Sequence, residues 1–288
     1  MIWNQWISEY EQLIRLSFFL GVFILVAMAE IISPRRRLSV SKALRWTNNL
    51  SLVVLNTLVL RLLFPAAAVG VAAFAQNSGW GLLNHYQPPF FLAVVISVVL
   101  MDMIIYLQHV MVHAVPALWR LHMVHHVDPD FDVTTGSRFH PLEIILSMLI
   151  KFATIAALGP PVVGVVIFEI LLNATAMFNH GNLRLPLRLD RVLRWFIVTP
   201  DMHRVHHSVI PTETNSNFGF NLPWWDRIFG TYQDQPQAGH TDMTIGIRGF
   251  QDPRKISWLP GMLVLPFIHV AKGYSIAERS SNQDDSTE

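Results

Sequence analysis

Histidine is the residue type whose number and spacing in this sequence most clearly indicate chemistry. Ten of the 13 histidines lie between positions 109 and 207. Neutral imidazole binds Zn, Fe, Cu and Ni, and ten imidazoles exceed what one tetrahedral or octahedral ion accepts. The pattern therefore predicts a site for two metal ions. The ten candidate ligands are His109, His113, His122, His125, His126, His140, His180, His203, His206 and His207.

Most of these histidines are spaced so that a helix would bring them to one face. His109 and His113 are four positions apart, and the pattern His-x-x-His-His occurs at 122–126 and again at 203–207. Residues three or four apart lie on the same side of an α-helix. Each cluster can therefore offer two or three imidazoles to one point.

Asp102 and Tyr106 extend the face of His109 and His113 back along the same predicted helix. That helix starts in an apolar stretch, and a polar stripe at membrane depth must face protein or water. Asp102 lies too far from His113 along the helix to bind the same ion. We expect it to support the ligands or to pair helices.

Two single histidines are expected to join the clusters. His140 precedes a proline and occupies an extended or N-cap position where a helical hairpin begins, and His180 ends that hairpin before a glycine. Because the two feet of one hairpin lie close together, we expect His140 to lie near His180. His85, His240 and His269 stand alone and are expected to be surface or core histidines.

The composition indicates a membrane protein. Of 288 residues, 52% are hydrophobic and 14% are charged, and the mean hydropathy is +0.37. Soluble domains carry about 25% charged residues, so a disordered chain, a nucleic-acid-binding protein and an ordinary soluble enzyme are excluded. Cysteine is absent. Thiolate zinc sites, Cys-bound iron–sulfur clusters and a Cys nucleophile are therefore excluded as well.

Four apolar stretches must hold the histidines in place, at about 13–32, 50–75, 90–113 and 144–178. The second is interrupted by Arg61 and Pro65 and is expected to kink or split. The fourth has Gly-Pro-Pro at 159–161, which suits a hairpin, and Glu169 is expected to pair with Lys151 across it. We predict an all-α integral membrane protein with about four transmembrane helices or half-hairpins, capped by a cytoplasmic helical histidine-rich domain for two metals.

The distribution of basic residues predicts the orientation. Arg35, Arg36, Arg37, Lys42 and Arg45 follow the first apolar stretch, whereas neither the first eleven residues nor the loop before the third stretch contains Lys or Arg. Cytoplasmic loops are enriched in Lys and Arg. The N-terminus is therefore expected outside, with the clustered histidines at or beyond the cytoplasmic surface.

Five motifs together resemble the fatty acid hydroxylase and sterol desaturase superfamily. They are Asp102-x3-Tyr106-x2-His109-x3-His113, Leu118-Trp119-Arg120-Leu121-His122-x2-His125-His126, Arg138-Phe139-His140-Pro141-Leu142-Glu143, Asn179-His180-Gly181-Asn182 and Thr199-Pro200-Asp201-Met202-His203-x2-His206-His207-Ser208. Asn217-Phe218-Gly219 and the run from Trp225 to Tyr232 are similar to the closing block of that family. The resemblance covers about residues 92–235, and the combination is highly specific.

The resemblance implies an integral-membrane, non-haem di-iron oxygenase that uses O2 and two electrons to hydroxylate or desaturate a lipid such as a fatty acyl chain or a sterol. It carries the metal-ligand role over to the same ten histidines and implies no catalytic residue apart from the metal centre. On this basis the chain divides into an N-terminal transmembrane region (1–89), a catalytic domain (90–235), a C-terminal membrane-associated segment (236–277) and a disordered tail (278–288).

The metal and the reaction class are open on the ligands alone. Oxidation of an unactivated C–H bond needs a redox metal, which favours two Fe ions, although Zn can occupy such a site on overexpression. The alternative is a zinc-dependent membrane hydrolase or a non-redox metal protein. The sequence has neither a Ser nucleophile motif nor His-Glu-x-x-His, and the oxygenase is favoured.

Electrons for an oxygenase are expected from a separate ferredoxin- or cytochrome-type donor with its reductase, because no flavin motif or iron–sulfur ligand is evident. A basic face formed by Arg184, Arg188, Arg191 and Arg194 could bind an acidic donor or lipid headgroups, and the enrichment of cytoplasmic surfaces in Lys and Arg explains it equally well. No retrieval signal for the endoplasmic reticulum is evident at the C-terminus, which favours a bacterial inner membrane. Trp119, Trp224 and Trp225 are expected at the membrane interface.

Overall fold

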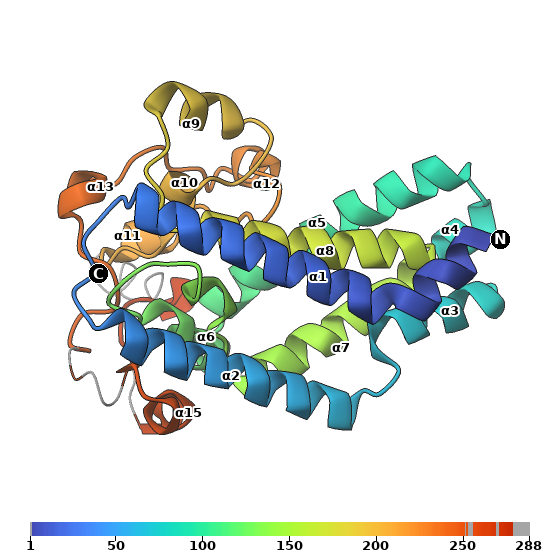
Figure 1. Ribbon diagram of the computed structural model, residues 1–288, viewed down its shortest axis with the longest axis horizontal. Helices are drawn as coiled ribbons and strands as arrows, with labels where there is room; N and C mark the ends of the chain where they lie inside the picture. The colour runs from blue at the N-terminus through green and yellow to red at the C-terminus, as the bar shows by residue number, and fades with distance from the viewer. Residues whose placement is uncertain (1, 251, 253–255, 269–270, 279–288) are drawn as a thin grey trace, which may run out of the picture.

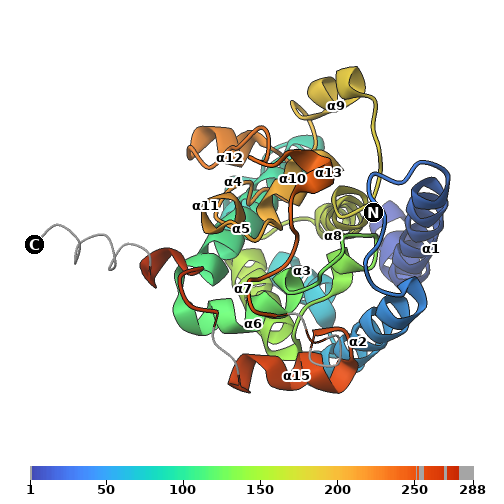
Figure 2. The ribbon, with the colours of Figure 1, turned by 90° about the vertical axis from the view of Figure 1, so that its left-hand side faces the viewer.

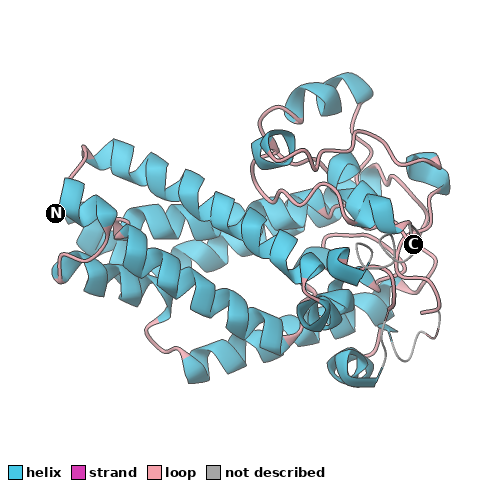
Figure 3. Ribbon diagram, turned by 180° about the vertical axis from the view of Figure 1, so that it is seen from behind, coloured by secondary structure: helices cyan, strands magenta, loops and turns pink. Residues whose placement is uncertain are grey.

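The computed structural model describes residues 2–250, 252, 256–268 and 271–278. Over these residues the protein is built from helices and loops, and Figure 3 shows no strand among them. The predicted tail at 278–288 and the isolated His269 lie outside the described residues, apart from residue 278. The elements are α1 (Ile2–Ile32), α2 (Lys42–Leu63), α3 (Ala67–Asn77), α4 (Leu82–Tyr86), α5 (Phe90–Ala114), α6 (Pro116–His126), the 3-10 helix η1 (Thr135–Ser137), α7 (Pro141–Leu158), α8 (Val162–Asn179), α9 (Leu187–Leu193), α10 (Pro200–His206), α11 (Pro211–Thr214), α12 (Trp224–Ile228), α13 (Gly239–Asp242) and α15 (Leu259–Ile268).

Five helical segments are long and apolar enough to cross a membrane. They cover Tyr10–Ile32, Lys42–Tyr86, Phe90–Ala114, Pro141–Leu158 and Val162–Asn179. The expectation of an all-α protein with several long apolar helices is confirmed. The sequence predicted about four spans, and the hairpin accounts for the difference. Each of its arms has 18 residues, or about 27 Å, and is counted separately.

The helices break where the sequence predicted. The second apolar stretch splits, with α2 ending at Leu63 and α3 beginning at Ala67 on the other side of Pro65. The hairpin turns at Gly159, whose φ of 65° is left-handed, and a Cβ there would lie 2.4 Å from the carbonyl oxygen of Trp80. Only glycine fits this turn.

The long helices form one bundle with the smaller elements gathered at one end. Figure 1 shows α1, α2, α5, α7 and α8 running along the long axis, with α3 and α4 near the N-terminus. The short helices from α9 to α13 lie at the opposite end, which Figure 2 views directly. Buried apolar residues of α3, α5, α7 and α8, including Met101, Val165 and Phe168, form the core of the bundle.

Charged residues inside the bundle are paired. Lys151 Nζ lies 2.7 Å from Glu169 Oε1, which confirms the pairing expected across the hairpin. Arg15 from α1 adds a second cation, 3.1 Å from Glu169 Oε2. This cluster joins α1, α7 and α8 inside the bundle, where an unpaired charge would be very costly.

A second buried ionic network fixes α2 to the loop that follows α6. Arg45 is fully buried and contacts Asp128 through two parallel bonds of 2.8 and 2.7 Å. The same guanidinium bonds Asp132 and, at 3.1 Å, Thr135 Oγ1. The loop therefore depends on one cation from a different helix.

Replacing Arg45 with Met should strongly destabilise the protein. The substitution removes the Arg45 cation that neutralises the buried carboxylates of Asp128 and Asp132. Breaking a buried ion pair in this way costs about 3–5 kcal/mol. Thermal unfolding in lipid nanodiscs should occur several degrees lower than in the wild type. Arg184→Met, at an exposed position, serves as the control and should unfold like the wild type. Equal unfolding temperatures for the two variants would show that this network does not hold the loop.

Candidate metal centre

Nine of the ten predicted histidines lie together in two buried groups at the loop-rich end of the bundle. The first group contains His109, His113, His122, His126 and His206, and the second contains His125, His180, His203 and His207. In each group the ligand-capable nitrogens all lie within 4.8 Å of one another. The arrangement offers two adjacent metal sites, one with five imidazoles and one with four.

Helical spacing explains how the rings divide between the groups. Histidines four positions apart share a group, as 109 with 113, 122 with 126 and 203 with 207 do. The remaining histidine of each His-x-x-His-His motif, His125 or His206, points to the other group. Each motif therefore contributes to both sites, because adjacent positions on a helix project about 100° apart.

His140 does not join either group. It is the N-cap of α7, as its position in the sequence predicted, and its Nδ1 accepts a hydrogen bond of 3.2 Å from the backbone N–H of Leu142. Its Nε2 lies 3.2 Å from the carbonyl oxygen of Leu263. Both nitrogens are thus engaged by backbone groups, while His180, its expected neighbour, belongs to the second group. His85 and His240 also lie outside both groups.

The hydrogen bonds fix which ring nitrogen carries the proton. His109 Nδ1 lies 2.8 Å from the carbonyl oxygen of Phe218, and His122 Nδ1 lies 2.6 Å from Glu143 Oε1. Both partners are acceptors, so each neutral ring carries its proton on Nδ1. The two Nε2 atoms nevertheless face each other at 3.2 Å. Two bare lone pairs at this distance repel each other unless a cation lies between them.

Three further rings are oriented in the same way. His113 Nδ1 donates to Asn215 Oδ1 at 3.1 Å, because the amide nitrogen of Asn215 is already donating to two carbonyl groups. His180 and His206 donate from Nδ1 to backbone carbonyl oxygens, each at 2.7 Å. In all three rings Nε2 is therefore unprotonated, and its lone pair is available to a metal ion. The Nε2 of His206 is buried with no protein partner. Bonds of this kind are typical of histidines that bind metals.

The distances between the nitrogens fit coordination of metal ions. The closest Nε2 pairs, 113 with 126, 125 with 180 and 180 with 203, are 3.0–3.2 Å apart. Metal–imidazole bonds are about 2.1 Å long, so two nitrogens bound at right angles lie about 3.0 Å apart and two in a tetrahedron about 3.4 Å. These residues fit two metal ions.

Burial keeps the rings in the form that binds metals. Removal from water, followed by the neighbouring imidazoles, lowers the pKa of His125, His126 and His203 well below the ordinary value. Burial lowers the pKa of His180 to about 3. These rings are neutral at physiological pH, and binding a metal ion does not require them to lose a proton first.

The segment from Asn215 to Leu222 holds several of these rings and is itself held by two buried carboxylates. Asp226 accepts hydrogen bonds from the backbone N–H groups of Phe218 and Gly219, at 2.7 and 2.9 Å. Asp102 on α5 accepts from the N–H groups of Asn221 and Leu222 and, at 2.8 Å, from the indole of Trp225. The expected supporting role of Asp102 is therefore seen, and the carbonyl of Phe218 is fixed where it meets His109.

Several residues around the site were not identified by sequence reasoning. Glu143 lies inside a quoted motif, and its position three residues after His140 was the only signal available for it. No sequence motif indicated the role of the Asn215 side chain. The carbonyl groups of Ser216 and Phe218 cannot be recognised from sequence, because every residue has a backbone carbonyl. Their roles depend on how the loop returns to α5.

Some surface expectations need correction. Trp119 and Trp225 are buried, with exposed fractions of 2% and 9%, so neither is an interface anchor, whereas Trp224 is exposed. Trp119 packs against the ring of His113, with the centroids 4.8 Å apart. Arg194 is also buried and pairs with Asp190 at 2.7 Å, so it does not belong to the basic face.

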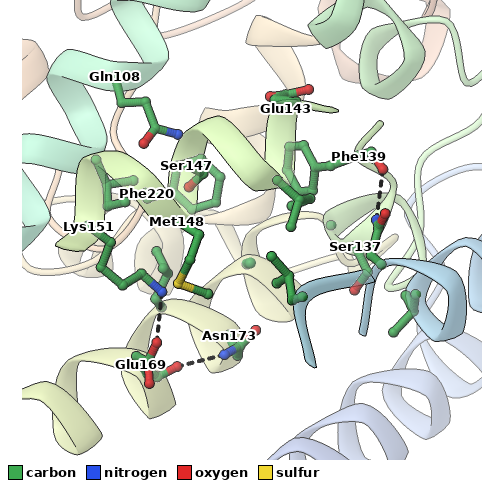
Figure 4. Close-up of a pocket in the computed structure, with 18 of the residues that line it drawn as sticks. Gln108, Ser137, Phe139, Glu143, Ser147, Met148, Lys151, Glu169, Asn173 and Phe220 are labelled. Carbon is green, nitrogen blue, oxygen red and sulfur yellow. Dashed lines mark hydrogen bonds and ion pairs between the residues drawn. The ribbon is translucent and has the colours of Figure 1, made fainter. Parts of the chain in front are cut away.

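A cavity of about 330 Å³ leads from the first histidine group into the bundle. It is lined by residues of α1, α2, α5, α7 and α8, and His109 and His122 form part of its wall. Figure 4 shows Glu143 and Phe139 on one side of it and the Lys151–Glu169 pair on another. A lipid segment in this cavity would reach the first histidine group without leaving the protein.

Comparison with known proteins gives one family match and several relatives. The fatty acid hydroxylase family model matches residues 94–231. The ornithine lipid hydroxylase OlsE of Rhizobium tropici is 30% identical over 65% of this chain and 54% of its own length. The human alkylglycerol monooxygenase is 28% identical over 53% of this chain and 33% of its own length. Fatty acid hydroxylase vlmA of a Lecanicillium species is 28% identical over 54% of this chain and 47% of its own length.

This chain thus spans about half the length of the ornithine lipid hydroxylase and about a third of that of the human enzyme. No solved structure matches it significantly. The matched region contains every histidine of both groups together with Asp102, Glu143 and Asp226. Residues 94–231 match the fatty acid hydroxylase family, and the relatives support the superfamily that the sequence motifs resemble.

Proposed function

We propose that this protein is a membrane-bound, non-haem di-iron oxygenase that hydroxylates or desaturates a lipid with O2 and electrons from a separate donor. The observation that carries the proposal is the pair of buried histidine groups whose unprotonated nitrogens converge. Such an arrangement is unfavourable without cations and is suited to two of them. The names of its relatives, hydroxylases and a monooxygenase, support an oxidative reaction.

The choice of iron rests on chemistry. Imidazole accepts both iron and zinc, so the nine proposed ligands do not distinguish these metals. Two bound iron ions supply the redox chemistry that O2 needs to oxidise an unactivated C–H bond. Zinc lacks this chemistry and is proposed only as a replacement after overexpression.

The residues of the chain perform the remaining tasks. Glu143 and the carbonyl groups near Phe218 hold the imidazoles in one tautomer and one orientation. The cavity positions part of the lipid beside His109 and His122 and keeps bulk water away. The ornithine lipid and alkylglycerol named in the relatives are polar lipids, and lipids of this kind are the first substrates to test.

Metal analysis tests the ligand assignment. The wild type purified from iron-supplemented cells should hold about two metal ions per chain, and His206→Ala and His125→Ala, which act on different groups, should each lose about one. His140→Asn is the matched control, because it keeps a capping acceptor at the start of α7 and removes an imidazole outside both groups. Full occupancy in both alanine variants, or loss of metal in His140→Asn, would contradict the assignment.

Electron supply distinguishes the oxygenase from the zinc hydrolase. Iron-loaded protein with a polar lipid and O2 should give at most about one turnover per centre after chemical reduction, and many once a ferredoxin- or cytochrome-type donor and its reductase are added. Mass spectrometry should find 18O from 18O2 in a hydroxylated product. Sustained product formation under nitrogen without reductant would instead support hydrolysis.

The membrane orientation is tested with reporter fusions. A reporter after Glu288 should be cytoplasmic and one inserted at Ser78, in the exposed turn after α3, should lie outside, because the Lys and Arg residues follow α1. Activity of paired cytoplasmic and periplasmic reporters in a bacterial host measures this. The reverse pattern would place the histidines on the outer side.

A further inference from the structure

The cavity beside the histidines is polar along much of its wall, although it lies among apolar helices. Glu143, Ser147 and Lys151 follow one another at intervals of four on α7 and all line it. This spacing puts them on one face of the helix over about 12 Å. Asn56 of α2 and Gln108 of α5 add amide groups to the lining. A saturated hydrocarbon chain would offer these groups no hydrogen bonds.

The charged groups of the wall that lie remote from the histidines are already paired with one another. Lys151 and Arg15 both pair with Glu169, and the side-chain amide of Asn173 donates to the carbonyl oxygen of Glu169 at 2.7 Å. Figure 4 shows the contacts of Glu169 with Lys151 and Asn173 on one side of the cavity. This part of the wall has its own partners and does not require a ligand.

The polar groups on other parts of the wall are not satisfied within the protein. Asn56 Oδ1, Gln108 Oε1 and Glu143 Oε2 are buried without a protein partner. Asn56 and Glu143 are more than nine-tenths buried. The orientation of Asn56 is fixed, because its Nδ2 donates to the carbonyl oxygen of Phe139 at 2.9 Å. All three atoms are oxygens that accept hydrogen bonds, so their missing partners are donors.

The volume of the cavity limits the size of the chemical group that can carry those donors. About 330 Å³ lies at the lower end of the range for small-molecule pockets, so only one part of a lipid fits inside. Three unpartnered acceptors favour the polar part of the lipid over its acyl chains. One of these acceptors belongs to Glu143, which also accepts a hydrogen bond from His122, so the polar part of the lipid would lie next to the first histidine group.

We propose that the cavity takes the hydrogen-bond-donating end of a polar lipid, a hydroxyl- or amine-bearing headgroup or backbone, and places that end beside His109 and His122. The acyl chains then remain towards the bilayer. This inference rests on the proposed lipid substrate and specifies which part of it the metal centre faces. Asn56 is the specificity-determining residue, because it provides a fixed acceptor without touching a histidine ligand.

Binding without turnover tests the proposal. The metal-loaded full chain in nanodiscs, kept without reductant, is given radiolabelled 1-hexadecanol, and the unlabelled alcohol, hexadecylamine and hexadecyl methyl ether compete for it. The ether has the same chain but no donor. The alcohol and the amine should each bind about tenfold more tightly than the ether, as expected for one or two hydrogen bonds.

Asn56→Leu should reduce this preference to about twofold or less, because it removes the acceptor and leaves the volume nearly unchanged. Ser51→Ala is the control on the same helix, since its hydroxyl bonds the carbonyl oxygen of Thr47 outside the cavity, and it should keep the full preference. Metal content and thermal unfolding establish that each variant is folded. If Asn56→Leu does not fold, Gln108→Leu takes its place and should reduce the preference too.

Equal affinity of the wild type for the alcohol and the ether would overturn the proposal, as would a full preference in a folded Asn56→Leu. Failure of the proposed function looks different. A protein that prefers the alcohol but forms no O2-dependent product from any lipid is not an oxygenase. An active oxygenase without the preference retains the function and loses this inference.

Discussion

The structure around the histidine groups depends on one electrostatic constraint: imidazole nitrogens face one another at close range in a buried site. His109 and His122 meet at Nε2 with both protons held on the far side of the rings, and the Nε2 of His180, whose proton is held on Nδ1, faces His125 and His203. Lone pairs at this distance are stable only around a cation. Binding of metal would therefore be linked to formation of this end of the protein, because histidines from positions 109 to 207 converge on two points.

That constraint explains why so many charged and polar groups are buried in an apolar chain. Five of the nine imidazoles are held by an acceptor at Nδ1, and several of these acceptors are held in their turn. Asp226 and Asp102 fix the backbone that carries the carbonyl of Phe218, and Arg45 fixes the loop between α6 and η1 through Asp128. These polar groups are connected to one another from the histidines outward.

Sequence periodicity was enough for the helices and for much of the site. The Gly-Pro-Pro break, the pairing of Lys151 with Glu169 and the convergence of the His-x-x-His-His motifs all follow from local spacing. Local spacing did not predict the hydrogen-bond partners that come from distant parts of the sequence. The carbonyl of Phe218 reaches His109 from more than 100 positions away. His140 had a ligand-like neighbourhood in the sequence, but capping α7 and the contact with Leu263 engage both of its nitrogens.

The helices that form the bundle also carry or position the ligands, and this links the bilayer to the chemistry. α5 begins among exposed apolar residues such as Phe91 and ends near His113, and α7 presents Glu143 to His122 at one end and Lys151 to the bundle two turns later. A lipid substrate of the proposed kind would need to move only along these helices to reach the histidines. Because the same two helices carry the unpartnered oxygens of Gln108 and Glu143, the cavity has hydrogen-bond acceptors near the first histidine group. An enzyme that oxidised only the middle of acyl chains would have no use for such a wall, since each unpartnered oxygen there would weaken binding of the substrate.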